Sequence, residues 1–160
     1  MKKFFKTIFV MSFVLLVILV GKSNAAALDA IQIDTNKEIV NPGSEIVLNI
    51  NFGKPLGAYT FDINYDNNLL EFVSTDGGTE NDNGTRVRIV YYDSSGGSNP
   101  KESMNVTFKA KEGIQTSNPT DFSITAEGLS NPDASESYDD ITVPIKKSIT
   151  VEPQYEDYKF

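Results

Sequence analysis

The sequence predicts an all-β domain in which two antiparallel sheets of about nine short strands pack face to face as a sandwich. Apolar and polar residues alternate in many short segments, and Gly, Pro, Asn and Asp mark turns between these segments. No stretch after the N-terminal leader shows the 3.6-residue period of an amphipathic helix. Because each predicted strand has a single apolar face, two sheets packed about 10 Å apart would bury these faces against each other.

Residues 1–25 predict a secretory signal peptide. Three lysines within the first six residues precede an apolar run, residues 8–20, and small residues follow at 23–25, where a signal peptidase would cut. The apolar run is too short for a comfortable membrane span of about 20 residues, although an uncleaved anchor is the alternative. We expect cleavage after Ala25 or Ala27, which makes the mature protein secreted and extracellular, either free or attached to the cell surface. No membrane contact is expected after cleavage.

The mature chain is expected to form one acidic domain. It spans residues 28–152 and is followed by a short acidic and aromatic tail, residues 153–160, or by the start of a truncated linker. Removing the four lysines of the leader takes the formal charge from −8 to about −12. An acidic surface keeps a secreted domain soluble and argues against nucleic acid or anionic membranes as partners.

The residue types that are missing restrict the chemistry. The chain contains no cysteine, no histidine and no tryptophan. Ser-His-Asp and Cys-His catalysis and histidine-based zinc sites are therefore excluded, and the core must hold together without disulfides. A glycosidase needs only two carboxylates, but no pair stands out from the turn and surface acids. We expect a protein that is not an enzyme.

The first strands follow from alternation and turn chemistry. Residues 28–34 predict the first strand, and Asn-Pro-Gly-Ser at 41–44 predicts a turn. Residues 45–52 predict a strand that ends at a Gly-Lys-Pro separator, residues 53–55. The apolar face of that strand consists of Ile46, Leu48, Ile50 and Phe52.

Residues 57–73 form the central stretch, which predicts two strands and the corner between them. One face of the first strand is aromatic and apolar and consists of Tyr59, Phe61, Ile63 and Tyr65; the other consists of Thr60, Asp62 and Asn64. Asp66 is expected to make an Asx turn with the backbone ahead of it, after which residues 69–73 resume as a strand.

The second half repeats the same pattern. Residues 76–85 predict a polar loop that ends in an Asn83-Gly84 hairpin turn, and residues 93–101 predict a flexible loop. Between these loops, residues 86–92 predict a strand with Val87, Ile89 and Tyr91 inside and Arg86, Arg88, Val90 and Tyr92 outside. Further strands are predicted at residues 103–111, 121–127 and 145–151, with a short one at 141–143. Met104, Val106, Phe108 and Ala110 are the inward residues of the first of these.

Several motifs, taken in their order, resemble a known family. A Pro-Gly-Ser turn leads into a strand, and the pattern Gly-x-x-x-Phe-x-x-x-Tyr-Asp-x-x-x-Leu-Glu-Phe follows at Gly57, Phe61, Tyr65, Asp66, Leu70, Glu71 and Phe72. A Tyr-Asp-Ser-Ser-Gly-Gly segment at 92–97 then precedes a strand that ends in Thr-Phe-Lys-Ala-Lys at 107–111. This order resembles the cohesin domain, the receptor module of cellulosome scaffold proteins, over nearly all of residues 28–152.

The resemblance implies a nine-stranded jelly-roll sandwich that binds a dockerin module on a secreted polysaccharide-degrading enzyme. It implies no metal or other cofactor here, because the calcium of such a pair belongs to the dockerin. The contact residues that it implies are Ala58, Thr60 and Asp62 on one strand and Arg88, Val90 and Tyr92 on another. The best-known cohesins carry Asn and Asp where this chain has Ala58 and Thr60.

Two other functions fit the same predicted fold. A carbohydrate-binding module would grip polysaccharide with a row of exposed aromatics, which without tryptophan would need outward tyrosines such as Tyr92 and Tyr138. A structural cell-surface or adhesion domain would bind neither. For individual residues, Asp62 and Thr60 are alternatively plain solvated side chains, Arg88 a counterion for nearby acids, and Tyr92 a cross-strand packing residue. Weak calcium binding by the acidic loop, residues 76–84, is a further alternative.

Overall fold

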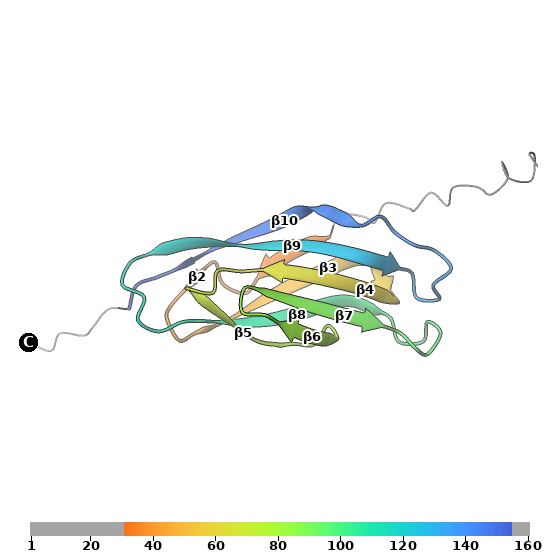
Figure 1. The fold of residues 1–160 in the computed structure, drawn as a ribbon, viewed down its shortest axis with the longest axis horizontal. Helices are drawn as coiled ribbons and strands as arrows, with labels where there is room; N and C mark the ends of the chain where they lie inside the picture. The colour runs from red at the N-terminus through yellow and green to blue at the C-terminus, as the bar shows by residue number, and fades with distance from the viewer. Residues whose placement is uncertain (1–30, 155–160) are drawn as a thin grey trace, which may run out of the picture.

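The computed structural model describes residues 31–154, and these residues form two β-sheets packed face to face, with the strands running along the long axis of the molecule (Figure 1). The strands are β1 (Gln32–Thr35), β2 (Ile39–Val40), β3 (Glu45–Leu56), β4 (Ala58–Asn64), β5 (Leu70–Thr75), β6 (Thr79–Asp82), β7 (Arg86–Tyr92), β8 (Lys101–Ala110), β9 (Asn118–Ser130) and β10 (Ile141–Val151). The predicted all-β sandwich is therefore confirmed. Within residues 31–154, no helix is long and apolar enough to cross a membrane.

The two sheets share the chain unequally. One has four strands in the order β1-β3-β8-β5, and the other has six in the order β2-β10-β9-β4-β7-β6. Neighbouring strands pair antiparallel, apart from β2, which pairs parallel with the end of β10. Among the described strands the chain changes sheet seven times, and two of these crossings, from β1 to β2 and from β5 to β6, join an edge strand of one sheet to an edge strand of the other. These two edge crossings cover both sides of the structure, which leaves the outer faces of the sheets as its broad free surfaces.

The core lies between the sheets and includes the residues that alternation predicted to point inward, of which Tyr91 is only partly buried. Phe61 of β4 and Phe108 of β8 are both fully buried, on opposite sheets. Aromatic rings join the two layers, since Phe108 contacts Phe122 of β9 with ring centroids 4.8 Å apart and Phe52 of β3 stacks on Phe61 at 5.4 Å. Each buried side chain of this size contributes about 1.5–3 kcal/mol to folding, so this core accounts for much of the stability without disulfides.

The strands of the structure differ from the predicted ones at four places. The strand β3 continues through the expected Gly-Lys-Pro separator, because its pairing with β8 is irregular between Asn51 and Leu56 and this bulge accommodates a proline. The short strand predicted at 141–143 joins the next one across another irregularity to form a single β10. The polar loop predicted at 76–85 contains β6, an exposed edge strand that pairs with β7 ahead of the expected Asn83-Gly84 turn. The two-residue β2 was not predicted.

Some predictions fall at the ends of the chain. The structure places the first strand at Gln32–Thr35, whereas residues 28–30 of the predicted strand, the predicted signal peptide and residues 155–160 of the predicted tail lie outside the described residues. The Asx turn predicted at Asp66 is confirmed, because its Oδ1 accepts a hydrogen bond from the Asn68 amide at 2.9 Å.

Hydrogen bonds from the outer face of the four-stranded sheet fix the crossing between β5 and β6. Both carboxylate oxygens of Asp76 accept hydrogen bonds from Asn105 of β8, from its backbone amide at 2.7 Å and from its side chain at 2.9 Å. Asn49 of β3 donates to the Asn105 side chain at 3.0 Å. One residue further along, the Gly77 carbonyl accepts the buried hydroxyl of Tyr59 of β4. The polar groups of this face are thus used to hold the chain where it enters the six-stranded sheet.

Candidate partner-binding surface

The six residues that the resemblance implied lie together on the outer face of the six-stranded sheet. Strands β4 and β7 pair in register, which sets the residues opposite one another as Ala58 and Tyr92, Thr60 and Val90, and Asp62 and Arg88. The residues between them along the strands, among them Phe61 and Ile89, are fully buried and point into the core. Because successive strand residues face opposite sides of a sheet, all six side chains point outward.

At one end of this surface, Asp62 and Arg88 form a bidentate ion pair. Arg88 donates from Nε to Asp62 Oδ1 at 2.9 Å and from Nη2 to Asp62 Oδ2 at 2.6 Å. Arg88 Nη2 also lies 3.5 Å from Glu127 Oε1 of β9, and Arg86 Nε lies 3.6 Å from Asp62 Oδ1. The hydrogen bonds from Arg88 are the main reason that the pKa of Asp62 lies below its usual value. The negative charge of Asp62 is therefore balanced by Arg88, and the ion pair fixes both side chains on the outer face of the sheet.

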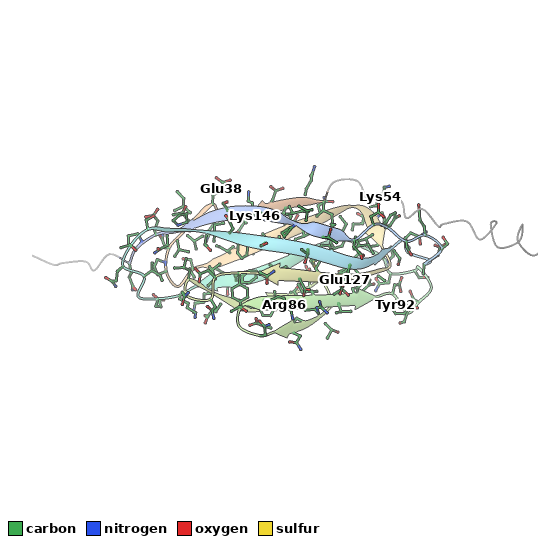
Figure 2. All side chains as sticks on the ribbon, turned by 45° about the horizontal axis from the view of Figure 1, so that its top comes forward. Glu38, Lys54, Arg86, Tyr92, Glu127 and Lys146 are labelled. Atoms are coloured by element: carbon green, nitrogen blue, oxygen red, sulfur yellow. The ribbon has the colours of Figure 1, made fainter. Side chains whose placement is uncertain are left out.

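The other end of the surface is apolar and exposed. Tyr92 is 70% exposed and Val90 is 44% exposed, and Ala58 lies half-buried opposite Tyr92. Figure 2 shows Tyr92 and Arg86 at opposite ends of β7, with Glu127 on the neighbouring part of the same face. Exposed aromatic and aliphatic side chains on a flat, hydrogen-bonded sheet are typical of protein contact surfaces.

The loop that follows Tyr92 is held by a carboxylate. Asp93 is buried, and its two carboxylate oxygens accept hydrogen bonds from the Ser95 amide and hydroxyl and from the Asn99 amide. These bonds, led by that of the Ser95 hydroxyl, lower the pKa of Asp93. The hydroxyl of Tyr91 donates to the Asn99 carbonyl, so the Ser- and Gly-rich loop is fixed at both ends. Hydrogen bonds within residues 91–99 therefore fix the position of the loop beside Tyr92.

Three loops meet at Gly57. Its amide donates to the Ser130 carbonyl at 3.0 Å, and its carbonyl accepts the Asp93 amide at 2.7 Å. A Cβ at this position would lie 2.6 Å from the carbonyl oxygens of Asn131 and Pro132, a distance that side chains do not adopt. Glycine is thus required where the β3–β4, β7–β8 and β9–β10 connections come together at the Tyr92 end of the surface.

A hollow of about 280 Å³ adjoins the surface on the β9 side. It lies where β10 departs from regular pairing with β9, between Ile141 and Ile145. Its lining consists of Thr60, Asp62, Thr125, Ala126, Glu127, Asp140, Ile141 and Thr142. Sequence analysis implicated Thr60 and Asp62 and missed the rest. Alternation predicts that Thr125 and Glu127 face outward, but no local signal shows which loop packs beside them.

The structure bears on two alternatives from the sequence. Tyr138, one of the two tyrosines that a carbohydrate-binding row would need, is only 8% exposed, so its expected outward position is wrong. Its ring instead packs under Lys54, whose Nζ lies 5.6 Å from the ring centroid. The acidic segment 76–84 is divided between a crossing and β6, and residues 31–154 contain no group of three or more Asp, Glu, His or Cys that could hold a metal ion.

Comparison with solved structures finds the same sandwich in bacterial cohesins. A cohesin module of a family 33 glycoside hydrolase from Clostridium perfringens superposes with a TM-score of 0.57 at 11% identity, covering 81% of this chain and all of the module. The cohesin of a type I cohesin–dockerin complex from Clostridium thermocellum gives 0.56 at 13% identity, covering 78% of this chain and 99% of that one. The sixth cohesin of scaffoldin B from Acetivibrio cellulolyticus, solved with a Cel5 dockerin mutant, gives 0.53 at 14% identity, covering 79% and 100%.

Sequence comparison gives the family. Among curated proteins, none matches the chain. The model of the cohesin domain matches residues 30–151, which include every strand that the structure describes. The chain belongs to the cohesin family.

Proposed function

We propose that this protein binds a dockerin module and that the outer face of the six-stranded sheet is its docking surface. The contact residues are Ala58, Thr60, Asp62, Arg88, Val90 and Tyr92. The observation that carries the proposal is the register of β4 and β7, which gathers these six side chains into three facing pairs on one flat surface. Two of the similar solved structures are cohesins in complex with dockerins, which supports the choice of partner.

The setting that fits this function is extracellular. The basic and apolar leader of residues 1–25 directs secretion, and the strongly acidic domain that follows is suited to solution outside the cell. Dockerins of this kind are carried by secreted enzymes that degrade polysaccharides, and a non-catalytic receptor of this type brings such enzymes together. The absence of histidine and cysteine from the sequence agrees with a binding role.

Capture of partners from the producing organism tests the proposal. The immobilised protein is incubated with the proteins that its host secretes, and the bound fraction is identified by mass spectrometry. We expect enzymes that carry a dockerin to be enriched, and to be released by chelation of calcium, which dockerins require for folding. A bound fraction without any dockerin-bearing protein would overturn the proposal. Parallel affinity gels with cellulose, xylan and chitin would reveal direct binding to sugar instead.

A matched pair of valines tests the docking face itself. Val90 on β7 and Val73 on β5 are both 44% exposed, but they lie on different sheets. Val90→Ala should weaken binding of the captured dockerin several-fold, whereas Val73→Ala should leave it unchanged, because only the first residue lies in the proposed contact. Equal effects of the two substitutions would place the contact elsewhere, while leaving the fold as described.

A further inference from the structure

The turn that joins β6 to β7 contains the only asparagine of the sequence that precedes a glycine. Asn83 is exposed there, and Gly84 has a φ of +89°, in the left-handed region that favours glycine. A Cβ built on Gly84 would meet no other atom within 4 Å, so the space around the residue is open. Because glycine has no Cβ to obstruct the approach, its backbone nitrogen can reach the side-chain carbonyl carbon of the residue before it. The turn therefore places an electrophile and a nucleophile in adjacent residues.

Three donors polarise the side-chain carbonyl of Asn83. Its Oδ1 accepts hydrogen bonds from the Thr85 amide at 3.1 Å, from the Arg86 amide at 2.9 Å and from the Thr85 hydroxyl at 3.2 Å. The Asn83 amide donates in turn to the Arg86 carbonyl at 3.1 Å, which holds the two ends of the turn together. Donors that point at one carbonyl oxygen stabilise the negative charge that develops on it when the carbonyl carbon is attacked. The turn thus supplies an oxyanion site around Asn83 Oδ1.

The Gly84 amide contacts a carboxylate. It donates a hydrogen bond to Asp82 Oδ1 at 3.0 Å, and the same oxygen accepts the Tyr65 hydroxyl at 2.9 Å. A backbone amide is a poor nucleophile while it keeps its proton, and a carboxylate within hydrogen-bond distance is placed to accept that proton. Asp82 therefore occupies the position of a general base for an attack by Gly84 N.

We propose that Asn83 is a site of self-catalysed deamidation, for which the turn supplies both the base and the oxyanion donors. Gly84 N forms a bond to Asn83 Cγ and passes its proton to the Asp82 carboxylate. The bond between Cγ and Nδ2 then breaks, and the amide nitrogen leaves as ammonia with the proton that Asp82 held. Water opens the cyclic imide. Hydrolysis of the new bond leaves an aspartate, and hydrolysis of the original peptide bond leaves an isoaspartate, so ammonia is exchanged for water in both cases.

The two products should affect the fold differently. An aspartate keeps an oxygen for the amides of Thr85 and Arg86, so the turn persists with one more negative charge. An isoaspartate adds a methylene to the backbone, which disturbs the register that sets Asn81 of β6 opposite Arg88 of β7. The reaction does not depend on the proposed function, although its second product loosens the strand beside the proposed docking face.

Asp76-Gly77 is the matched pair within the same segment, because an aspartate before glycine forms the same imide. The contacts of this pair differ. Both carboxylate oxygens of Asp76 are bonded to Asn105, and the Gly77 amide donates to the Thr75 hydroxyl at 3.0 Å, where it faces no carboxylate. The carboxyl group is thus held away from its own chain by the neighbouring strand. We expect isoaspartate to form at position 83 and not at position 76 while the protein is folded.

Peptide mapping of the stored protein tests the proposal. The full chain is kept folded at neutral pH, and samples taken over several weeks are digested and analysed by mass spectrometry. Conversion is measured as the mass gain from replacing an amide NH₂ by a hydroxyl, and isoaspartate is quantified by labelling with an isoaspartate methyltransferase. We expect conversion to rise with time in the peptide that contains Asn83. No conversion of Asn83, or conversion no faster than that of the other asparagines, would overturn the proposal.

Three variants test the groups assigned to the reaction. Asp82→Asn keeps an acceptor of the same shape but removes the base, and should slow conversion about tenfold, less than in an enclosed active site because water can replace the base. Thr85→Val should slow it about twofold, since two of the three donors remain. Tyr65→Phe removes the other hydrogen bond to Asp82 and keeps the carboxylate, so it should not slow the reaction.

Urea separates the effect of the turn from that of the dipeptide. In the unfolded chain, the unchanged protein and the three variants should convert at one rate, because the donors and the base are no longer held around Asn83. Circular dichroism confirms that each variant is folded before the native rates are compared. Equal rates of the unchanged protein and Asp82→Asn in the folded state, or the same difference between them in urea, would overturn the assignment of Asp82.

Discussion

The two outer faces of the sandwich are built from the same kind of strand but differ in what they leave exposed. On the four-stranded sheet, Asn49, Asn105 and Asp76 satisfy one another and fix a crossing of the chain. On the six-stranded sheet, Asp62 and Arg88 also satisfy each other, yet Val90 and Tyr92 beside them stand in solvent. Both faces have paired polar groups, so polarity does not distinguish them. The distinguishing feature is the amount of exposed apolar surface, because Val90 and Tyr92 lie together on β7, whereas Val73 is the one large hydrophobic residue that the described part of the four-stranded sheet exposes.

This difference separates stability from recognition. Side chains that the fold already satisfies should lower the free energy of unfolding when they are removed. Side chains that protrude from a hydrogen-bonded sheet add little to folding and are available to a partner. Substitutions on the two faces should therefore move different measurements, and the following predictions test this separation from the largest expected effect to the smallest.

The largest loss of stability is expected for a substitution in the core that both sheets share. Phe108→Ala should lower the free energy of unfolding by about 3–5 kcal/mol, because it empties the space between Tyr65, Phe72 and Phe122, which come from both sheets. Urea unfolding followed by circular dichroism measures this. Dockerin binding should fall in proportion to the folded fraction. A loss below about 1 kcal/mol would mean that the two layers are less tightly joined here than their ring contacts indicate.

Tyr92→Ala should act on recognition alone. We expect dockerin binding to weaken by about 1–2 kcal/mol or more, because an exposed aromatic side chain at the proposed contact is lost. The free energy of unfolding should change by less than about 0.5 kcal/mol, since the side chain is mostly in solvent. Calorimetric titration and urea unfolding on the same preparation give both values. Unchanged affinity would move the docking surface away from the β4–β7 face.

Asp76→Ala should act in the opposite way. It removes both acceptors of the Asn105 amide and side chain and so loosens the crossing into β6, which should cost about 1–2 kcal/mol of stability. Affinity for the dockerin should remain within about twofold, because Asp76 is outside the proposed contact. A larger loss of affinity than of stability would show that the two faces are coupled through the crossing.

The Asp62–Arg88 pair should contribute modestly despite its geometry. A double-mutant cycle with Asp62→Ala and Arg88→Ala should give a coupling energy of about 0.2–1 kcal/mol in unfolding, because Arg88 is partly solvent-exposed and water screens the pair. The same cycle measured on dockerin binding reports whether the pair only stabilises the fold or also contacts the partner. A zero coupling in binding together with the expected coupling in unfolding would assign it to the fold.

Acid should weaken the same pair in a defined direction. The pKa of Asp62 is lowered in the folded protein, mainly by hydrogen bonds from Arg88, so its contribution to stability is fully present above the unfolded value of about 3.9. It is lost as the pH falls through the lowered folded value. Urea unfolding between pH 7 and pH 2 should show that Asp62→Asn differs most from the unchanged protein at neutral pH and least at the acid end. A constant difference would contradict this assignment.

How far the sequence predicts the structure depends on whether a residue's place is set by its neighbours along the chain. Alternation placed Phe61 and Phe108 in the core because burial of a half-apolar strand depends on period two. It missed β6, whose four residues are all exposed and polar, because an edge strand that overhangs the core needs no apolar face. Pro55 suggested that the strand ends before it, but β3 continues to Leu56 because the bulge in its pairing with β8 accommodates a proline.

The candidate surface divides in the same way. The six proposed contact residues followed from the family resemblance and from outward alternation, and the register of β4 with β7 sets them opposite one another. The hollow could not be predicted, since it depends on an irregularity between β9 and β10 and on Asp140 in the connection between them. Tyr138 was placed outside for a related reason, because no periodic strand surrounds it to indicate that its ring is covered.

Gly57 restricts how this surface can change. Its backbone is bonded to the strand end at Ser130 and to Asp93, and its missing side chain leaves room for Asn131 and Pro132. The loops on either side of Tyr92 therefore share one contact point, and lengthening either would press on the other. A variant with altered partner choice is more readily reached by exchanging side chains on the strands than by grafting a new loop. Any loop exchange would have to replace both segments together.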